Sequence, residues 1–385
     1  MLNSQPASSA NQPDLSVAAF RADVAARSVV DHFGHRFLGI PGTHLGSIKH
    51  PATRLESVAE WHYWWQAHYV DCLVDTGLRE LATGTRFDGE HRPSAGALAS
   101  HLVRTIRLRN FLRYTNWFYD DMAWLALAAE RLDNLAKATN SGGRERNQQA
   151  TNALRRALES AHTHQLGGGI FWNTKRDFKN TPATAPAALF FARQGQRKRA
   201  QELIDWLNNS LLDGQRGLYL DGLKIRGTET VLESAVYSYN QGPVLGALLE
   251  LGGVDNLDRA AALVIAVEQH LSVDGVLLTH GHGDGGLFTG ILVRYLAVAA
   301  TDHRLPEEVR GAAIRMVQAT ADALWEGRRE RTIRKGLLGR RRTVTIFSSA
   351  PEKPAEEIYP PEAAVELSTQ LQAWMTLEAA ATSAT

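Results

Sequence analysis

The chain has 385 residues, of which 44% are hydrophobic, and its 42 lysines and arginines face 41 acidic residues for a formal net charge of +1. This balance provides no field that would favour a polyanion such as nucleic acid over a neutral ligand, and the apolar share is that of a globular protein. The only cysteine is Cys72, which excludes an intrachain disulfide and a cysteine-based metal site.

The N-terminal segment, residues 1–13, is rich in Ser, Ala, Asn and Pro, which predicts a disordered tail. It lacks a basic region followed by an apolar run, so it does not resemble a signal peptide. A cytoplasmic location is therefore expected, although a secreted chain whose leader had been removed would read the same. No segment approaches the roughly 18 apolar residues of a membrane span.

From residue 14 to residue 385 we expect one domain, because apolar residues recur there at three- and four-residue spacings, as in amphipathic helices. The periodicity alone indicates a mostly α-helical protein. Short apolar runs beside glycines predict two small hairpins, at 217–225 and 274–279. The pattern predicts twelve helices, near residues 15–33, 57–75, 95–113, 117–138, 146–163, 183–194, 196–212, 233–251, 256–271, 287–301, 306–326 and 361–380.

Two adjacent aspartates, Asp120 and Asp121, stand where an aromatic stretch becomes an apolar-periodic helix. Consecutive Cα atoms lie about 3.8 Å apart. Carboxyl groups about 5 Å apart suit double displacement at a sugar carbon, whereas inversion needs roughly 6.5–9.5 Å. Two carboxylates that close also repel, so that one is held protonated while the other is ionised. The structural alternative is that the pair caps the helix and complements its dipole.

The segment around this pair, Tyr119-Asp-Asp-Met-Ala-Trp124, resembles the Tyr-Asp-Asp-x-Ala-Trp signature of glycoside hydrolase family 76, the bacterial and fungal endo-α-1,6-mannanases. One position, in the segment that starts at Phe288, departs from the family pattern, since Thr289 stands where the family often has lysine. This difference puts in doubt any contact that the lysine would make with the sugar. Four further segments resemble family motifs in the family's order, namely Trp61–Asp71, Gly167–Asn180, Tyr239–Gly242 and Phe288–Leu296.

The resemblance implies an all-α (α/α)6 barrel with short rim hairpins, no cofactor and a monomer. It also implies retaining, endo-acting cleavage of α-1,6-mannan or a mannosylated glycolipid, with Asp120 as nucleophile and Asp121 as general acid and base. Aromatic rings can pack on a pyranose face while polar groups bind its hydroxyls. On this basis the substrate-binding residues are expected to be Trp64, Trp65, Gln66, Tyr119, Trp124, Trp172, Asn173, Asp177, Lys179, Asn180, Tyr239, Asn240, Gln241, Phe288 and Arg294.

Two other functions fit the same kind of barrel. One is a sugar epimerase or isomerase that moves protons with histidines, and the other is a mannan-binding protein without activity. The intact aspartate pair favours the hydrolase. The segment His280-Gly-His282-Gly-Asp284 resembles a set of metal ligands, but zinc sites need three or four ligands in a defined geometry. Because the family uses no such centre, no metal is expected.

A basic segment, from Arg328 to Arg342, contains seven arginines and one lysine. Such clusters can bind nucleic acid, yet no aromatic residues interleave this one, as single-strand binding would require. The segment is therefore predicted to be a solvated hairpin or loop. A site for anionic glycolipid headgroups is the alternative.

Overall fold

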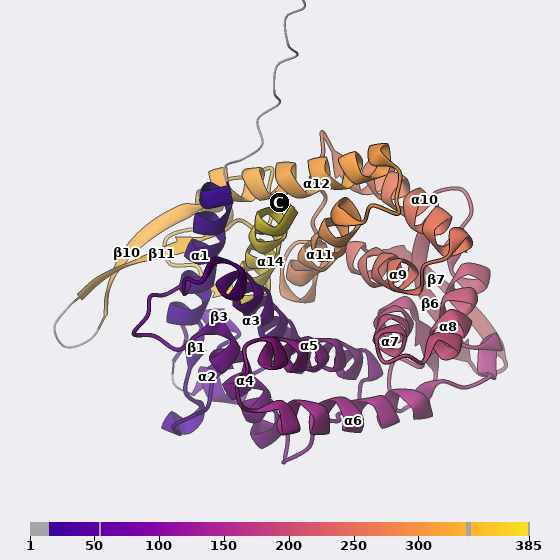
Figure 1. Cartoon of the computed structure of the whole chain (residues 1–385), viewed down its shortest axis with the longest axis horizontal. Coiled ribbons are helices and arrows are strands. Elements are labelled where there is room, and N and C mark those ends of the chain that lie inside the picture. The colour runs from indigo at the N-terminus through magenta and orange to yellow at the C-terminus, as the bar shows by residue number, and fades with distance from the viewer. Residues whose placement is uncertain (1–14, 54, 336–339, 384–385) are drawn as a thin grey trace, which may run out of the picture.

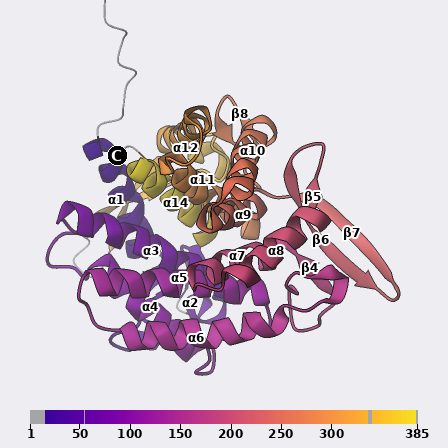
Figure 2. The same ribbon diagram turned by 45° about the vertical axis from the view of Figure 1, so that its right-hand side comes forward.

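The computed structural model describes residues 15–53, 55–335 and 340–383, so the predicted tail at 1–13 lies outside the described residues. Long helices alternate along the chain between an outer and an inner ring (Figures 1 and 2). The outer helices are α1 (Leu15–His32), α4 (Ala95–Arg109), α6 (Arg144–Ala161), α8 (Arg197–Ser210), α10 (Val254–Leu271) and α12 (Glu307–Glu326). The inner helices are α3 (Tyr63–Thr83), α5 (Tyr119–Ala138), α7 (Thr181–Arg193), α9 (Ser238–Leu251), α11 (Phe288–Thr301) and α14 (Leu367–Ser383).

The inner ring is closed, because each inner helix packs on the next and α14 packs on α3. Each outer helix covers a neighbouring inner one, as α4 covers α3 and α6 covers α5. The predicted (α/α)6 barrel with twelve long helices is confirmed. Two one-turn helices, α2 (Glu56–Ala59) and α13 (Ala355–Ile358), lie in the connections.

The two rings differ in the distribution of their apolar residues. Helix α7 is buried from Thr181 to Ala192, whereas α6 buries mainly one stripe that includes Leu154 and Leu158. An outer helix exposes its polar face to water, so an amphipathic stripe suffices for it. The inner helix α7 is enclosed on all sides, which is why its sequence is almost entirely apolar.

Glycines allow the inner helices to approach one another closely. A Cβ atom on Gly246 of α9 would lie 2.6 Å from the Tyr295 ring of α11, and one on Gly290 of α11 would lie 2.8 Å from the Cα atom of Gln372 on α14. Both distances are below any real Cβ contact. The inner helices can therefore approach this closely only because glycine, which has no side chain, occupies these two positions.

Some predicted helix boundaries are wrong for identifiable reasons. The helix predicted at 233–251 begins at Ser238, because residues 229–236 pair with another strand. The helix predicted at 57–75 begins at Tyr63, after His62 at a φ of 36°, and it continues to Thr83, where Gly84 in the left-handed region ends it. Within the described residues, no helix has both the length and the apolar character needed to cross a bilayer.

Short strands connect the helices at the rim. A four-stranded sheet has β6 (Leu218–Arg226) paired antiparallel with β4 (Phe178–Asn180), β5 (Leu212–Asp213) and β7 (Glu229–Val236). The hairpin predicted at 217–225 is wrong, because this segment forms the single strand β6, which pairs with β7 in a larger sheet. The other predicted hairpin is confirmed as β8 (Ser272–Val273) with β9 (Val276–Leu277). Two small pairs are β1 (Gly34–His35) with β2 (Leu45–Gly46), and β3 (Lys49–His50) with β12 (Val365–Glu366).

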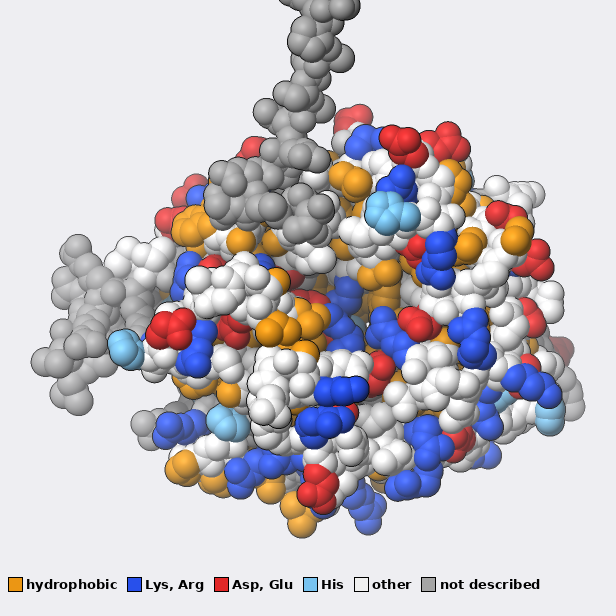
Figure 3. Space-filling model, in the orientation of Figure 1, with side chains coloured by type: hydrophobic (Ala, Val, Ile, Leu, Met, Phe, Trp, Pro, Cys, Tyr) orange, Lys and Arg blue, Asp and Glu red, His pale blue; other side chains and the backbone are white. Residues whose placement is uncertain are grey.

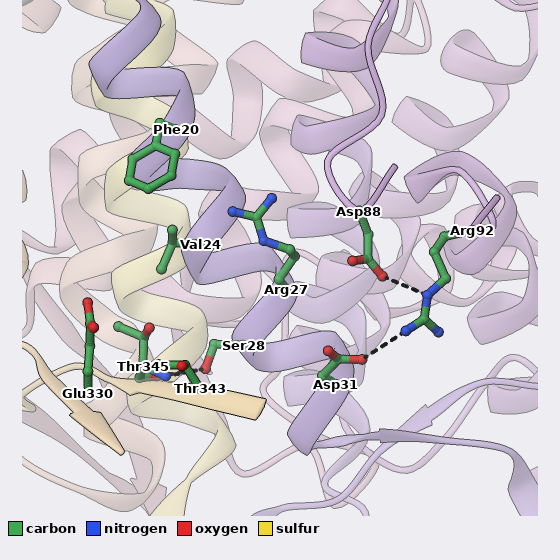
Figure 4. A pocket seen from close by; sticks show the side chains of 10 residues that line it. All are labelled: Phe20, Val24, Arg27, Ser28, Asp31, Asp88, Arg92, Glu330, Thr343 and Thr345. Carbon is green, nitrogen blue, oxygen red and sulfur yellow. Dashed lines mark hydrogen bonds and ion pairs between the residues drawn. The ribbon is translucent and has the colours of Figure 1, made fainter. Parts of the chain in front are cut away.

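The basic segment forms the hairpin β10 (Arg329–Lys335) and β11 (Arg340–Ile346), which extends away from the ring (Figure 1). Its base is attached to α1, since Ser28 Oγ donates to the Thr345 carbonyl at 2.7 Å and accepts from its N–H at 3.2 Å. A groove of about 470 Å³ lies beside this attachment (Figure 4). Among its charged lining residues, Arg92 pairs with Asp88 and Asp31. Arg27 and Glu330 pair with residues outside the lining, Asp23 and Arg328.

Candidate active site

The adjacent aspartates lie in the first turn of α5, as predicted. Residues from the starts of α3 and α9, and from the segments before α7 and α11, gather around them. These residues lie at the end of the ring where the inner helices begin, whereas Figure 3 views the other end, on the side of the C-terminus (Figure 1), where apolar and charged side chains surround a central hollow.

Asp120 is held by two hydrogen bonds that favour its ionised form. Its Oδ2 accepts from Trp172 Nε1 at 2.9 Å, and its Oδ1 accepts from the N–H of Asp121 at 2.9 Å. Burial nevertheless raises the pKa of Asp120 to about 7, and these hydrogen bonds oppose the rise. Asp120 is thus oriented by fixed donors and can ionise near neutral pH.

Asp121 occupies a less favourable setting for a negative charge. Burial raises its pKa well above the ordinary value, and the charge of Asp120 raises it further. Only Asn116 opposes the shift, by donating from Nδ2 to Asp121 Oδ2 at 2.6 Å. Asp121 therefore keeps its proton when Asp120 has lost its own. A pair that merely capped the helix would remain solvated and ionised, so these environments favour a chemical role.

Main-chain bonds hold Trp172 beside Asp120. The N–H of Tyr119 donates to the Trp172 carbonyl at 2.7 Å, and the N–H of Thr174 donates to the Trp117 carbonyl at 3.0 Å. The N–H of Trp172 in turn donates to the Phe178 carbonyl at 2.7 Å. The loop before α7 is thereby joined to the start of α5, which fixes the indole on the Asp120 carboxylate.

Aromatic rings line the neighbouring part of the site. Tyr239 and Phe288 stack with ring centroids 3.9 Å apart and planes within 7°, and Trp64 lies 6.3 Å from Phe288. We call Trp64, Phe288 and Tyr239 the aromatic wall. These predicted residues are brought together, and each is partly exposed. Such rings provide the flat apolar surface that a pyranose ring prefers.

Other predicted aromatic residues lie beneath this surface. Trp124 and Tyr119 are 4% and 5% exposed and belong to the core. Trp65 is 3% exposed, and its ring stacks on His62 with centroids 4.4 Å apart. These three support the site from below, and the structure gives their rings no open face for a sugar.

Lys179 was expected to bind substrate, but the structure corrects this. Lys179 Nζ is enclosed and donates to the carbonyls of Thr163, Gln165 and Gly168 at 2.8, 2.7 and 2.6 Å. An ammonium has three protons, so none remains for a sugar hydroxyl. Its neighbour Asn180 caps α7, where its Oδ1 accepts from the N–H of Ala183 at 3.2 Å.

Two predicted glutamines are also structural. Gln66 joins α3 to Gly46, accepting from its N–H and donating to its carbonyl, both at 2.9 Å. Gln241 does the same for Tyr219 on β6, at 2.8 and 2.9 Å. Both side chains are completely buried. Each amide completes the backbone pairing of a strand, so neither is available to substrate.

Arg294, also expected to bind substrate, has a structural role instead. It lies on α11 and pairs with Asp71 at 2.8 Å and with Asp75 at 2.6 Å, both on α3. Arg131 of α5 binds the same two carboxylates. The four side chains form a network that joins three inner helices in the interior of the ring.

Three predicted polar residues remain open to a ligand role. Asp177 is exposed. Asn173 is 7% exposed, and its Oδ1 accepts from the N–H of Lys175 at 2.9 Å. The Oδ1 atom of Asn240 is buried and has no partner among the described residues. Asn240 is completely buried, as Gln66 and Gln241 are, but unlike theirs its amide oxygen is left unpaired by the described residues.

The structure adds three residues that sequence reasoning did not place in the site: Asn116, Asp221 and Asp284. Asn116 binds Asp121. Asp221 accepts from Asn240 at 3.5 Å, and burial raises its pKa to about 6. Asp284 accepts from Trp64 and Trp65. Asp284 lies within the segment compared with a set of metal ligands, but only the folded chain shows which carboxylates converge.

The segment from His280 to Asp284 resembles a set of metal ligands in sequence. Among the described residues, no group of three or more His, Cys, Asp or Glu side chains is arranged to hold a metal ion. His280 instead accepts a hydrogen bond from the N–H of Ser238 at 3.2 Å.

Comparison with known proteins identifies the family of this chain. The sequence profile of glycosyl hydrolase family 76 matches residues 19–345. The chain belongs to this family. A comparison with curated proteins finds no match.

Solved structures agree with this membership. The α-1,6-mannanase of family 76 from Salegentibacter sp. is 27% identical, with 96% of this chain and 99% of that chain covered and a TM-score of 0.75. An inactive variant of that enzyme, with two consecutive aspartates replaced by asparagine, is 26% identical and was solved with α-1,6-mannotriose. A protein from Listeria innocua, 23% identical over 94% of this chain and 97% of its own, has the same fold with a TM-score of 0.74.

Proposed function

We propose that this family 76 glycoside hydrolase is a retaining endo-α-1,6-mannanase in which Asp120 is the nucleophile and Asp121 the general acid and base. The observation that carries the proposal is the unequal environment of the two adjacent carboxyls. The similar Salegentibacter enzyme, whose inactive form has two consecutive aspartates replaced, supports it. Family membership favours hydrolysis over the epimerase alternative.

The proposed reaction has two steps. An ionised Asp120 oxygen attacks the anomeric carbon as Asp121 gives its proton to the glycosidic oxygen, so that the carbon–oxygen bond breaks and a glycosyl ester forms on Asp120. Asp121, now ionised, then takes a proton from water as the water oxygen attacks the same carbon and releases Asp120. The hydrogen bond from Trp172 keeps the Asp120 carboxylate ionised and oriented before attack.

Product analysis tests the substrate class and the endo action together. Incubation with linear α-1,6-mannan should produce a series of shorter oligosaccharides early in the reaction. If mannose is the only early product, the enzyme cleaves from the chain end, and the endo assignment is wrong. An unchanged polymer, with hydrolysis of another glycan, would contradict the proposed linkage.

Retention of configuration is the first prediction. Two adjacent carboxyl groups lie too close together to leave room for the water that inverting hydrolysis needs, so we expect double displacement. Proton NMR during the first minutes of hydrolysis should show α-configured reducing ends before mutarotation. The appearance of β-configured ends first would contradict the assignment of Asp120 as nucleophile.

The second prediction concerns Trp172→Phe, which removes the indole N–H but keeps a ring. A donor to the carboxylate stabilises its ionised form, so its loss should raise the pKa of Asp120. The acidic limb of the kcat/KM profile should then move to higher pH by about one to two units, since a hydrogen bond to a charged group is worth about 1.5–3 kcal/mol.

A matched control for this variant is Trp325→Phe, on the outer helix α12. It makes the same chemical change far from the pair, and its pH profile should match that of the wild type. An unshifted acidic limb in Trp172→Phe would show that the indole does not stabilise the Asp120 charge.

A further inference from the structure

The segment that resembled a metal site has a different relation to the active site. Asp284 lies on the 3-10 turn Gly283–Leu287 directly before α11. Its Oδ1 accepts from Trp64 Nε1 at 3.0 Å and from Trp65 Nε1 at 2.9 Å. Two indoles on one oxygen orient the whole carboxylate group.

The second carboxylate oxygen has a different environment. Asp284 is an exposed residue, and its Oδ2 accepts no hydrogen bond and forms no ion pair with any described side chain. One oxygen is thus fixed by the protein, while the other has no partner among the described side chains. A carboxylate that served only to hold the two indoles would not need to be exposed.

The turn that carries Asp284 is fixed by close packing. A Cβ atom on Gly285 would lie 2.2 Å from the His280 carbonyl oxygen, and one on Gly286 would lie 2.7 Å from Ser368 Oγ. The N–H of Gly283 donates to Glu366 Oε2 at 2.6 Å. The position of Asp284 is therefore set before any ligand arrives, as an efficient binding group requires.

Asp284 also lies close to the catalytic pair and to the aromatic wall. Trp64, which holds its Oδ1, is part of that wall. After burial, the charge of Asp284 is one of the causes that raise the pKa of Asp120 and of Asp121. A sugar stacked on the wall next to the scissile bond would bring its hydroxyl edge to the open oxygen.

We propose that Asp284 is a substrate-binding residue whose open Oδ2 accepts hydrogen bonds from the hydroxyls of a mannose unit stacked on the aromatic wall. The inference rests on the proposed function and assigns a recognition group to the same site. A preformed acceptor of this kind discriminates against a sugar that lacks the matching hydroxyl, because such a sugar would displace water from the carboxylate without giving it a hydrogen bond.

The test is the affinity for α-1,6-mannotetraose in the Asp120→Asn/Asp121→Asn background, where no turnover occurs and the pKa of the pair has no influence. In Asp284→Asn the amide oxygen can still accept from both indoles, but the charge and the open acceptor are lost. Hydrogen bonds to charged groups are worth about one to two powers of ten in affinity. We expect at least a roughly tenfold weaker Kd with an unchanged melting temperature.

Two further variants make the result unambiguous. Asp258→Asn, on the exposed face of α10, makes the same chemical change away from the cleft and should bind as the background does. Asp284→Ala removes the acceptor of the indoles as well. If Asp284→Asn binds normally and only Asp284→Ala is weak, Asp284 merely positions the indoles and the proposal is overturned.

Failure of the proposed function would look different. If the background does not bind mannotetraose and the wild type does not cleave α-1,6-mannan, the substrate assignment is wrong, and the role of Asp284 with it. Binding by the background together with normal affinity in Asp284→Asn overturns only the role of Asp284.

Discussion

Asp121→Asn is expected to lower kcat on unactivated α-1,6-mannan by at least about 10²–10⁴-fold, which is the usual worth of general acid and base assistance. The amide has nearly the volume of the acid but no proton to give to the leaving oxygen. The loss should appear in kcat and not in KM, because the proton is transferred in the transition state and not when the substrate binds. Initial rates of reducing-end release measure it.

Asp120→Asn is expected to lose as much or more, because no glycosyl ester can form on an amide. The two variants should differ with a substrate whose leaving group departs without a proton. Asp121→Asn should then recover its first step and accumulate the covalent intermediate, whereas Asp120→Asn should not. If Asp120→Asn recovers its first step with this substrate, Asp120 is the general acid and Asp121 the nucleophile.

Both variants should fold normally, since each conserves side-chain volume and introduces no buried charge. Equal melting temperatures for the wild type and both variants would show that the lost rate is chemical. Near wild-type hydrolysis of unactivated mannan by either variant would remove that aspartate from the mechanism.

The fold could be predicted from the sequence to the extent that it depends on periodicity. Outer helices such as α6 carry a single apolar stripe, and inner helices such as α7 are apolar throughout, so the number of long helices was predictable. Their arrangement in a ring was implied by the family resemblance. The start of α9 was not predictable, because residues 229–236 form a strand only once β6 is present to pair with them.

The candidate site could be predicted only in part, because ligand contacts and internal contacts use the same polar residue types. Lys179 and Gln241 lie in family motifs, yet their donors are used by carbonyls of the chain itself. Asp284 was noted only as a possible metal ligand, since nothing local connects it with Trp64, which precedes it by 220 residues. Such pairs are visible only when the ring closes.

Arg294 is the clearest example of a motif residue whose contacts are internal, and the last prediction concerns it. As a motif residue it was expected to bind sugar, whereas in the structure it neutralises Asp71 and Asp75 together with Arg131. Arg294→Met would leave two buried carboxylates with one guanidinium. Breaking a buried ion pair by removing one partner costs about 3–5 kcal/mol, which should lower the melting temperature by roughly 5–10 °C in a chain of this size.

The matched control is Arg315→Met, which breaks an ion pair with Glu268 at 2.8 Å where the arginine side chain is 62% exposed. Exposed pairs are worth about 0–1 kcal/mol, so this variant should melt within about 2 °C of the wild type. A substrate role for Arg294 predicts the opposite pattern, with normal melting and weak mannotetraose binding. Because three inner helices meet at this network, we expect Arg294→Met to lose stability while the folded fraction keeps its affinity.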